Sequence, residues 1–87
     1  MTKKKFASDM IDKPLVNNEG ETIGIIVNFV VDTLSGTVKN VLVKPEGQDR
    51  YEDFSVDKEN RYMIPLSRIK PFRDVYVTEV KKKKIVR

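Results

Sequence analysis

The sequence predicts a small all-β domain, an antiparallel and strongly bent sheet of five or six short strands that closes into a barrel. Three observations predict this class. Apolar side chains recur at alternate positions over 22–32 and 74–80, which is the periodicity of strands. Turn-forming residues separate the apolar runs, and no convincing amphipathic helix is present. The 87 residues, 39% hydrophobic and 34% charged, provide one compact core and no second one.

The first predicted hairpin joins a short strand at 13–16 to a long strand at 22–32 through the turn residues 17–20. Every odd position of the long strand is apolar, so we expect this parity to face the core. These core candidates are Ile23, Ile25, Val27, Phe29 and Val31. The even positions are mixed, and Gly24 indicates a bend or a close backbone approach.

The second predicted hairpin turns at Gly36 and returns over residues 37–44. Val38 and Leu42 share one parity, whereas Val41 and Val43 share the other. A β-bulge near Lys39-Asn40 would explain this shift, and a strand buried on both faces is the alternative.

Residues 45–60 are acidic, rich in turn formers and without sustained periodicity, so we predict a long loop anchored by Tyr51, Phe54 and Val56. Its carboxylates could be read as a calcium cluster. They are Asp49, Glu52, Asp53 and Asp57. The EF-hand spacing is missing, so a solvated loop is the favoured interpretation and we predict no metal site.

The last predicted elements are a short strand at 61–64 that ends at Pro65, one helical turn at 66–69 and a final strand at 74–80. In the final strand we expect Val75 and Val77, together with Val80 at its end, to face the core, and Tyr76 and Thr78 to face outward.

The composition argues against most catalytic classes. The chain contains no Cys and no His, which removes thiol chemistry, Ser-His-Asp triads and most zinc sites. We therefore expect no enzyme, no cofactor and no small-molecule substrate. The longest apolar run, 23–31, is too short to span a bilayer, and the N-terminus does not look like a signal peptide, so we expect a cytoplasmic protein.

The positive charge of the chain is concentrated at its two ends. Eight of the 17 basic residues lie there, and they are Lys3, Lys4, Lys5, Lys81, Lys82, Lys83, Lys84 and Arg87. The segment 6–80 holds the other nine and all 13 acids, a net charge of −4. We therefore divide the chain into a basic tail at 1–9, a domain at 10–80 and a basic tail at 81–87. Such tails are usually solvated, and the alternative is contact with the phosphates of RNA, DNA or an anionic lipid surface.

The order of these motifs resembles the PRC-barrel family, the small domain of the photosynthetic reaction-centre H subunit and of the bacterial ribosome-maturation factor. Stand-alone archaeal versions are especially similar. The resemblance covers about residues 10–80 and is carried by Ile11 to Val16, Gly20, Ile23-Gly24, Val30-Val31-Asp32, Ser35-Gly36-Thr37-Val38, Val41-Leu42-Val43, Ile64-Pro65 and Ile69. Members often have glycine just before the last strand, where this chain has Phe72-Arg73.

The resemblance implies a non-catalytic adaptor in larger assemblies, such as those of archaeal cell division. We expect a protein partner, with a second copy in a homodimer as one case. The proposed contact residues are the outward apolar side chains Ile26, Val30, Phe72 and Tyr76. The alternative for these side chains is that the 45–60 loop or a terminal segment covers them. The alternative function is a factor of ribosome assembly or RNA processing whose lysine tails contact phosphate, and a membrane surface is the weaker possibility.

Overall fold

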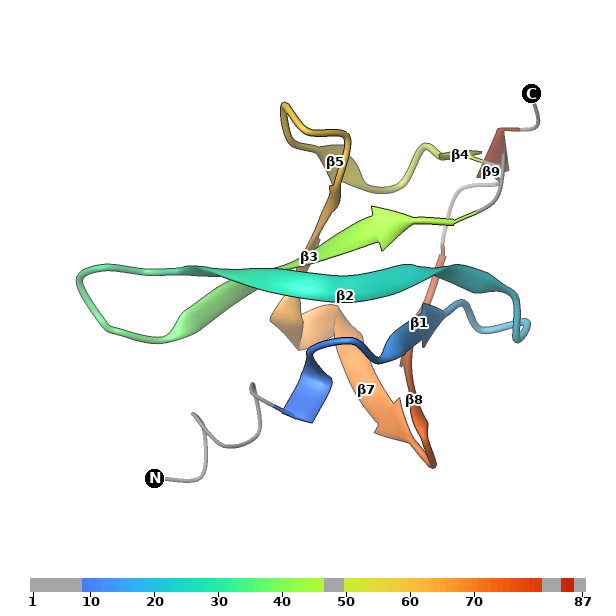
Figure 1. The fold of residues 1–87 in the computed structure, drawn as a ribbon, viewed down its shortest axis with the longest axis horizontal. Helices are drawn as coiled ribbons and strands as arrows, with labels where there is room; N and C mark the ends of the chain where they lie inside the picture. The colour runs from blue at the N-terminus through green and yellow to red at the C-terminus, as the bar shows by residue number, and fades with distance from the viewer. Residues whose placement is uncertain (1–8, 47–49, 81–83, 86–87) are drawn as a thin grey trace.

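The computed structural model of the chain describes residues 9–46, 50–80 and 84–85 (Figure 1). Seven strands form one sheet in the order β5-β6-β3-β2-β1-β8-β7, and β4 pairs with β9 in a second ladder. The strands are β1 (Pro14–Val16), β2 (Thr22–Val31), β3 (Val38–Pro45), β4 (Arg50–Tyr51), β5 (Ser55–Val56), β6 (Tyr62–Pro65), β7 (Ile69–Phe72), β8 (Val75–Thr78) and β9 (Lys84–Ile85). One 3-10 turn, η1 (Leu66–Arg68), connects β6 to β7. The all-β class is confirmed.

The long hairpin of β2 and β3 organises the sheet and carries two irregularities. Val30 pairs with Asn40 and Val31 with Val38, so Lys39 is the extra residue of a bulge at the predicted place. The other bulge lies in β2, where Val27 is extra between the pairs made by Ile26 and Asn28. Strand β3 is also buried on both faces, which was the alternative to the bulge, because Val41, Leu42 and Val43 are all buried.

Strand β1 lies between β2 and β8, whereas the close backbone approach at Gly24 is between β2 and β3. Leu15 pairs with Gly24 on one side and with Tyr76 on the other. A Cβ atom at Gly24 would collide with the Lys44 carbonyl oxygen of β3 and lie 2.8 Å from Cγ1 of Val43, so only glycine fits where β2 approaches β3. The β1–β8 pair is parallel, which corrects the expectation of a wholly antiparallel sheet. Nearly the whole domain serves as the long crossover that a parallel pair requires.

Strand β8 faces the opposite way from the prediction, whereas Val80 beyond its end packs against the core as predicted. Tyr76 packs against the core cluster and Thr78 is 1% exposed, whereas Val75 and Val77 lie on the other face. The reason is register: Tyr76 pairs with the buried Leu15, and paired residues share a face. Arg73 has φ 56 just before β8, so it adopts the left-handed conformation that glycine adopts more easily.

The 45–60 segment is more ordered than a plain loop, because it supplies β4 and β5 and part of the core. Tyr51 and Phe54 are buried and pack with Tyr62, their ring centroids lying 6.1 and 5.4 Å from that of Tyr62. The Tyr62 hydroxyl accepts a hydrogen bond of 3.2 Å from the Tyr51 backbone N–H. The expected anchors Tyr51 and Phe54 are thus confirmed, and Val56 is wrong because it is 49% exposed.

The strand order ends at β5 and β7, and no ladder joins these two strands in the described part of the chain. The sheet is therefore open by hydrogen bonding, whereas the sequence predicted closure and only five or six strands. The additional strands are short: β5 lies inside the expected loop, and β7 follows the predicted helical turn directly. Neither strand has enough residues to show a periodicity of its own.

Candidate functional site: the outer face of the sheet

The sheet carries apolar side chains on both of its faces. Directly paired residues point to the same side, so the pairings divide the strands into an inner face around the core and a face opposite to it. We call the apolar residues of the second set the outer face. They are Pro14, Val16, Ile25, Val30, Leu42, Met63, Pro65, Phe72, Val75 and Val77.

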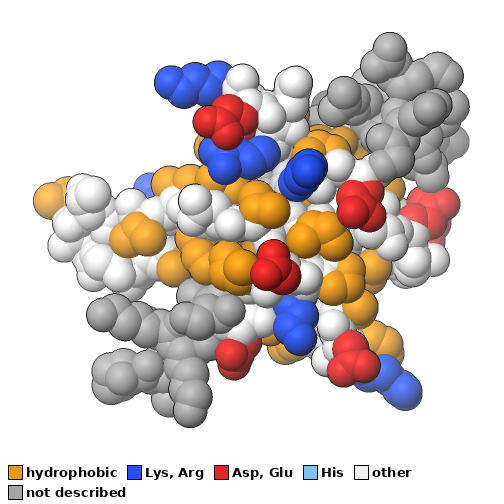
Figure 2. Space-filling model, in the orientation of Figure 1, with side chains coloured by type: hydrophobic (Ala, Val, Ile, Leu, Met, Phe, Trp, Pro, Cys, Tyr) orange, Lys and Arg blue, Asp and Glu red, His pale blue; other side chains and the backbone are white. Residues whose placement is uncertain are grey.

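Burial agrees with this division, because no residue of the outer face belongs to the core cluster or packs against it. Phe72 is 59% exposed, Pro65 is also exposed, Leu42 is 6% exposed, and the other seven are partly exposed. In the space-filling view, hydrophobic side chains reach the surface in a band that follows β2 and continues toward β1 and β8 (Figure 2). Antiparallel sheets commonly present a polar face to water, so this second apolar face is a feature that calls for a function.

The four residues expected to contact a partner are divided between the two faces. Val30 and Phe72 lie on the outer face, as expected. Ile26 is wrong, because it is fully buried in the core, and Tyr76 is wrong, because it packs against the core. The extra residue Val27 explains the first error, since it inverts the parity of β2 between Ile26 and Val30.

Two lysines are the charged side chains at the paired strand positions of this face in the described residues. Lys44 pairs with Ile25, and Lys70 pairs with Val77. Both lysines are exposed, and neither has an ion pair with another described residue. The outer face is thus apolar along its middle and positively charged at two of its borders, although the 6–80 segment is acidic as a whole.

A second exposed apolar feature is the outer half of the β2–β3 hairpin, which projects beyond the neighbouring strands (Figure 1). Strand β1 pairs with β2 only up to Ile25, and β6 pairs with β3 only from Asn40 onward. Leu34 at the tip is 97% exposed and Val31 is 48% exposed. The turn itself is held by Asp32, whose side chain accepts a 2.9 Å hydrogen bond from the Leu34 N–H. That hydrogen bond is the main reason why the pKa of Asp32 is lowered.

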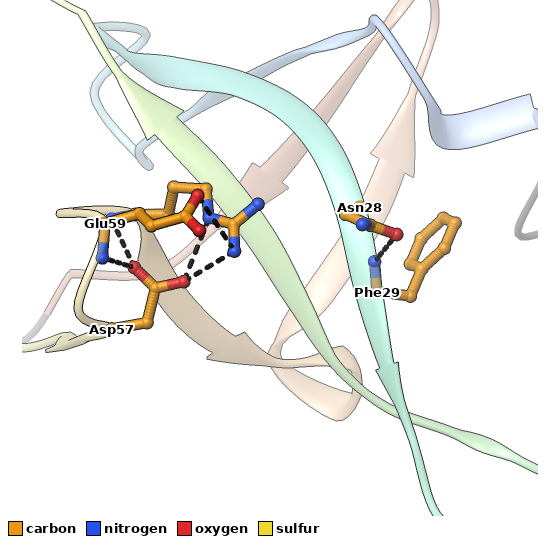
Figure 3. A network of polar contacts seen from close by, with 5 residues as sticks. Asn28, Phe29, Asp57 and Glu59 are labelled. Carbon is orange, nitrogen blue, oxygen red and sulfur yellow. Dashed lines mark hydrogen bonds and ion pairs between the residues drawn. The ribbon is translucent and has the colours of Figure 1, made fainter.

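The acidic segment is held by two arginines, each of which engages a different carboxylate. Oδ1 of Asp57 accepts hydrogen bonds from the backbone N–H groups of Glu59 and Arg61, at 2.9 and 2.8 Å, and Oδ2 lies 2.9 Å from the Arg61 guanidinium (Figure 3). The backbone N–H of Arg61 is the largest of the effects that lower the pKa of Asp57. On the opposite side of the segment, Arg68 lies 2.6 Å from Asp53 and stacks over the Phe54 ring.

These contacts give Asp53 and Asp57 structural roles, so two of the four carboxylates of the conceivable calcium cluster already pair with arginines. Asp49 lies outside the described residues. No group of three or more His, Cys, Asp or Glu side chains converges within the described ranges. A search of the same ranges for a helix that could cross a membrane finds none.

Most of the basic residues expected to contact anions lie outside the described residues: Lys3, Lys4, Lys5, Lys81, Lys82, Lys83 and Arg87. Lys84 belongs to β9, whose backbone pairs with β4 at Tyr51. This pairing places two positions of the expected C-terminal tail, Lys84 and Ile85, in a strand, and Lys84 lies next to a residue of the core.

Sequence reasoning missed the outer face as a unit, because its residues come from six strands whose order in space is not their order in the chain. The usable signal was local: residues 22–31 carry apolar side chains at both parities, as do 75–77. Such segments can cover two faces instead of one.

A comparison with curated proteins finds no match. The family model of the PRC-barrel domain matches residues 3–85. The match extends over nearly the whole described chain, including β9 and the outer face. The chain therefore belongs to the PRC-barrel domain family.

Proposed function

We propose that this PRC-barrel chain is a non-catalytic adaptor that binds a partner protein through the outer face. The observation that carries the proposal is the second apolar face of the sheet, which extends from the buried Leu42 to Phe72 at 59% exposure. An apolar patch of this kind is stabilised when a partner removes it from water, by about 25 cal/mol for each Å² buried. An aromatic side chain such as Phe72 is typical of the residues that dominate binding energy.

The polar groups support a binding role in preference to a reactive one. The two carboxylates with lowered pKa values, Asp32 and Asp57, accept hydrogen bonds from backbone N–H groups of their own turns. A reactive site would instead bring together titratable groups with opposing pKa shifts. Absence of Cys and His from the whole chain removes the thiol nucleophile and the imidazole that most often serves as general base.

The direct test is capture of partners from a lysate of the source organism with wild-type protein and the variant Phe72→Ser/Val77→Ser. Both positions lie on the outer face and outside the core, so the variant should retain its fold. Leu34→Ser, at the exposed tip of the hairpin, is the matched control. Proteins held by the wild type and the control but lost by the double variant support the proposal. Retention of the same proteins by all three would remove the outer face from the adaptor function.

For the cellular process, the resemblance to archaeal PRC-barrel proteins supports cell division, and self-association into a homodimer is a further prediction. Light scattering checks the homodimer, because a monomer at high concentration would contradict it. The alternative is an RNA-processing or ribosome-assembly role, favoured by the eight basic residues at the chain ends. Deletion of residues 1–5 and 81–87 should then abolish retention of RNA on a filter at low salt, and unchanged retention would exclude the tails as the contact.

A further inference from the structure

We propose that the outer face binds an amphipathic helix that has an apolar stripe along its length and a carboxylate at each end of that stripe. This inference rests on the proposed function and names the chemistry of the partner for the same face. It follows from where Lys44 and Lys70 lie relative to the apolar residues, and from the lack of free backbone donors at Ile69 and Pro71 on the β7 edge of the sheet.

The two lysines lie at opposite ends of a row that crosses five strands. From Lys44 the cross-strand pairs lead to Ile25 and then to Pro14. Two residues further along β1, Val16 leads to Val77 and then to Lys70. The row is therefore apolar between two cations, and four strand spacings give it a length of about 19 Å.

Charge favours an acidic partner for this row. The paired positions of the outer face hold Lys44 and Lys70 and no carboxylate in the described residues. The exposed Glu46 follows two residues after Lys44, where its backbone N–H bonds to the Ile23 carbonyl, and it forms no ion pair with Lys44. A partner that covers the apolar residues would bring its own groups beside both ammonium groups. Carboxylates there would form ion pairs, whereas neutral or basic groups would leave the lysines partly desolvated and uncompensated.

The same charges disfavour a second copy of this chain on the outer face, so the homodimer predicted above would use another surface. In a two-fold dimer the same patch meets itself, so the lysine borders of the two copies would lie close together. Nucleic acid is also disfavoured, because the row offers aliphatic side chains where single strands need aromatic platforms, and Phe72 is the one aromatic residue of the outer face.

Strand addition at the β7 edge is hindered, which favours binding across the face. Phe72 and Val75 close the two-residue turn of the β7–β8 hairpin, so the backbone groups of Ile69 and Pro71 point away from β8. Pro71 has no N–H, and the Ile69 N–H is already bonded to the Leu66 carbonyl. An added strand would find acceptors and no free donor at these two positions. A helix needs no such donors, and about 13 residues of helix span about 19 Å.

The test uses two synthetic 14-residue peptides with the same leucine-alanine stripe, one with two glutamates at each end and the other with two lysines at each end. Each is titrated into the full chain labelled with 15N, and affinity is measured by fluorescence anisotropy at low and high salt. The glutamate peptide should bind about tenfold more tightly at low salt, and the difference should shrink as salt rises. The largest amide shifts should fall at Ile25, Val16 and Val77.

Charge reversal by Lys44→Glu/Lys70→Glu should invert the preference between the two peptides. The control Lys39→Glu/Lys58→Glu makes the same change in net charge at exposed positions off the row, and it should preserve the preference. Equal affinity for both peptides on the outer face would overturn the acidic partner and leave the adaptor proposal standing. Absence of binding by either peptide, or shifts confined to other surfaces, would overturn this inference, while the lysate capture separately decides the adaptor proposal.

Discussion

Ile25 and Ile26 are adjacent and chemically identical, yet they lie on opposite faces of the sheet. Ile26 is fully buried in the core, whereas Ile25 is partly exposed on the outer face, outside the core cluster. Substitution of each by alanine removes the same atoms from the same strand. Any difference in stability therefore reports which face each side chain occupies.

The expected difference is large. Truncation of a fully buried isoleucine to alanine costs about 2–5 kcal/mol, because the lost burial is increased by the cavity left behind. We expect Ile26→Ala to lose about 3 kcal/mol and Ile25→Ala less than about 1 kcal/mol. In a domain of this size each kcal/mol shifts Tm by about 4–8 °C, so the two variants should melt at least about 8 °C apart.

Urea unfolding followed by circular dichroism, together with thermal melts, measures both variants against the wild type. Ile25→Ala should also weaken binding of the glutamate-ended peptide, because Ile25 belongs to the apolar part of the proposed contact, next to Lys44. Equal losses of stability, or a larger loss at Ile25, would refute the assignment of the two faces and with it the basis of the adaptor proposal.

Three further outcomes are expected from individual contacts. Gly24→Ala should lower the free energy of unfolding in urea by roughly 3 kcal/mol, because its Cβ meets the backbone of β3. Gly36→Ala should lower it by about 1 kcal/mol, because Gly36 has φ 74 but no atom within 4 Å of an added Cβ. Similar losses for the two variants would contradict the close approach at Gly24. The pKa of Asp57 is lowered in the folded state, so this carboxylate stabilises the fold above its unfolded pKa and loses that effect as pH falls through the folded pKa. Urea midpoints of Asp57→Asn measured from about pH 6 to about pH 2.5 should therefore fall less steeply in acid than those of the wild type, and parallel profiles would contradict this. Arg68→Lys should lower the free energy of unfolding in urea by about 1–2 kcal/mol, since lysine cannot reproduce the contacts of the guanidinium with Asp53 and the Glu79 carbonyl. If the losses caused by Arg68→Lys and Asp53→Asn simply add in the double variant, the two residues are not coupled.

The acidic segment shows how far local pattern carries a prediction. Its lack of periodicity correctly indicated an irregular excursion, and its aromatic residues correctly indicated anchors at Tyr51 and Phe54. The partners of its carboxylates could not be predicted, because Arg68 is 15 residues away from Asp53 in the chain. That contact exists only once η1 and β8 lie beside the segment.

The sequence by itself determined the all-β class, the positions of the main strands, the bulge at Lys39 and the family. These features depend on local properties, since periodicity, turn residues and the order of motifs are read along the chain. Only the tertiary structure decided which parity faces the core. In β2 the extra residue Val27 inverts the alternation, and in β8 the parallel pairing with β1 turns Tyr76 inward and Val77 outward.

The physical reason is that these strands are apolar at both parities, so neither face is excluded by solvation of polar side chains. A shift of one residue exchanges the two faces at little local cost, and the choice between them is made by register with neighbouring strands. The outer face, the two lysines at its borders and the partner chemistry that they indicate all follow from that choice.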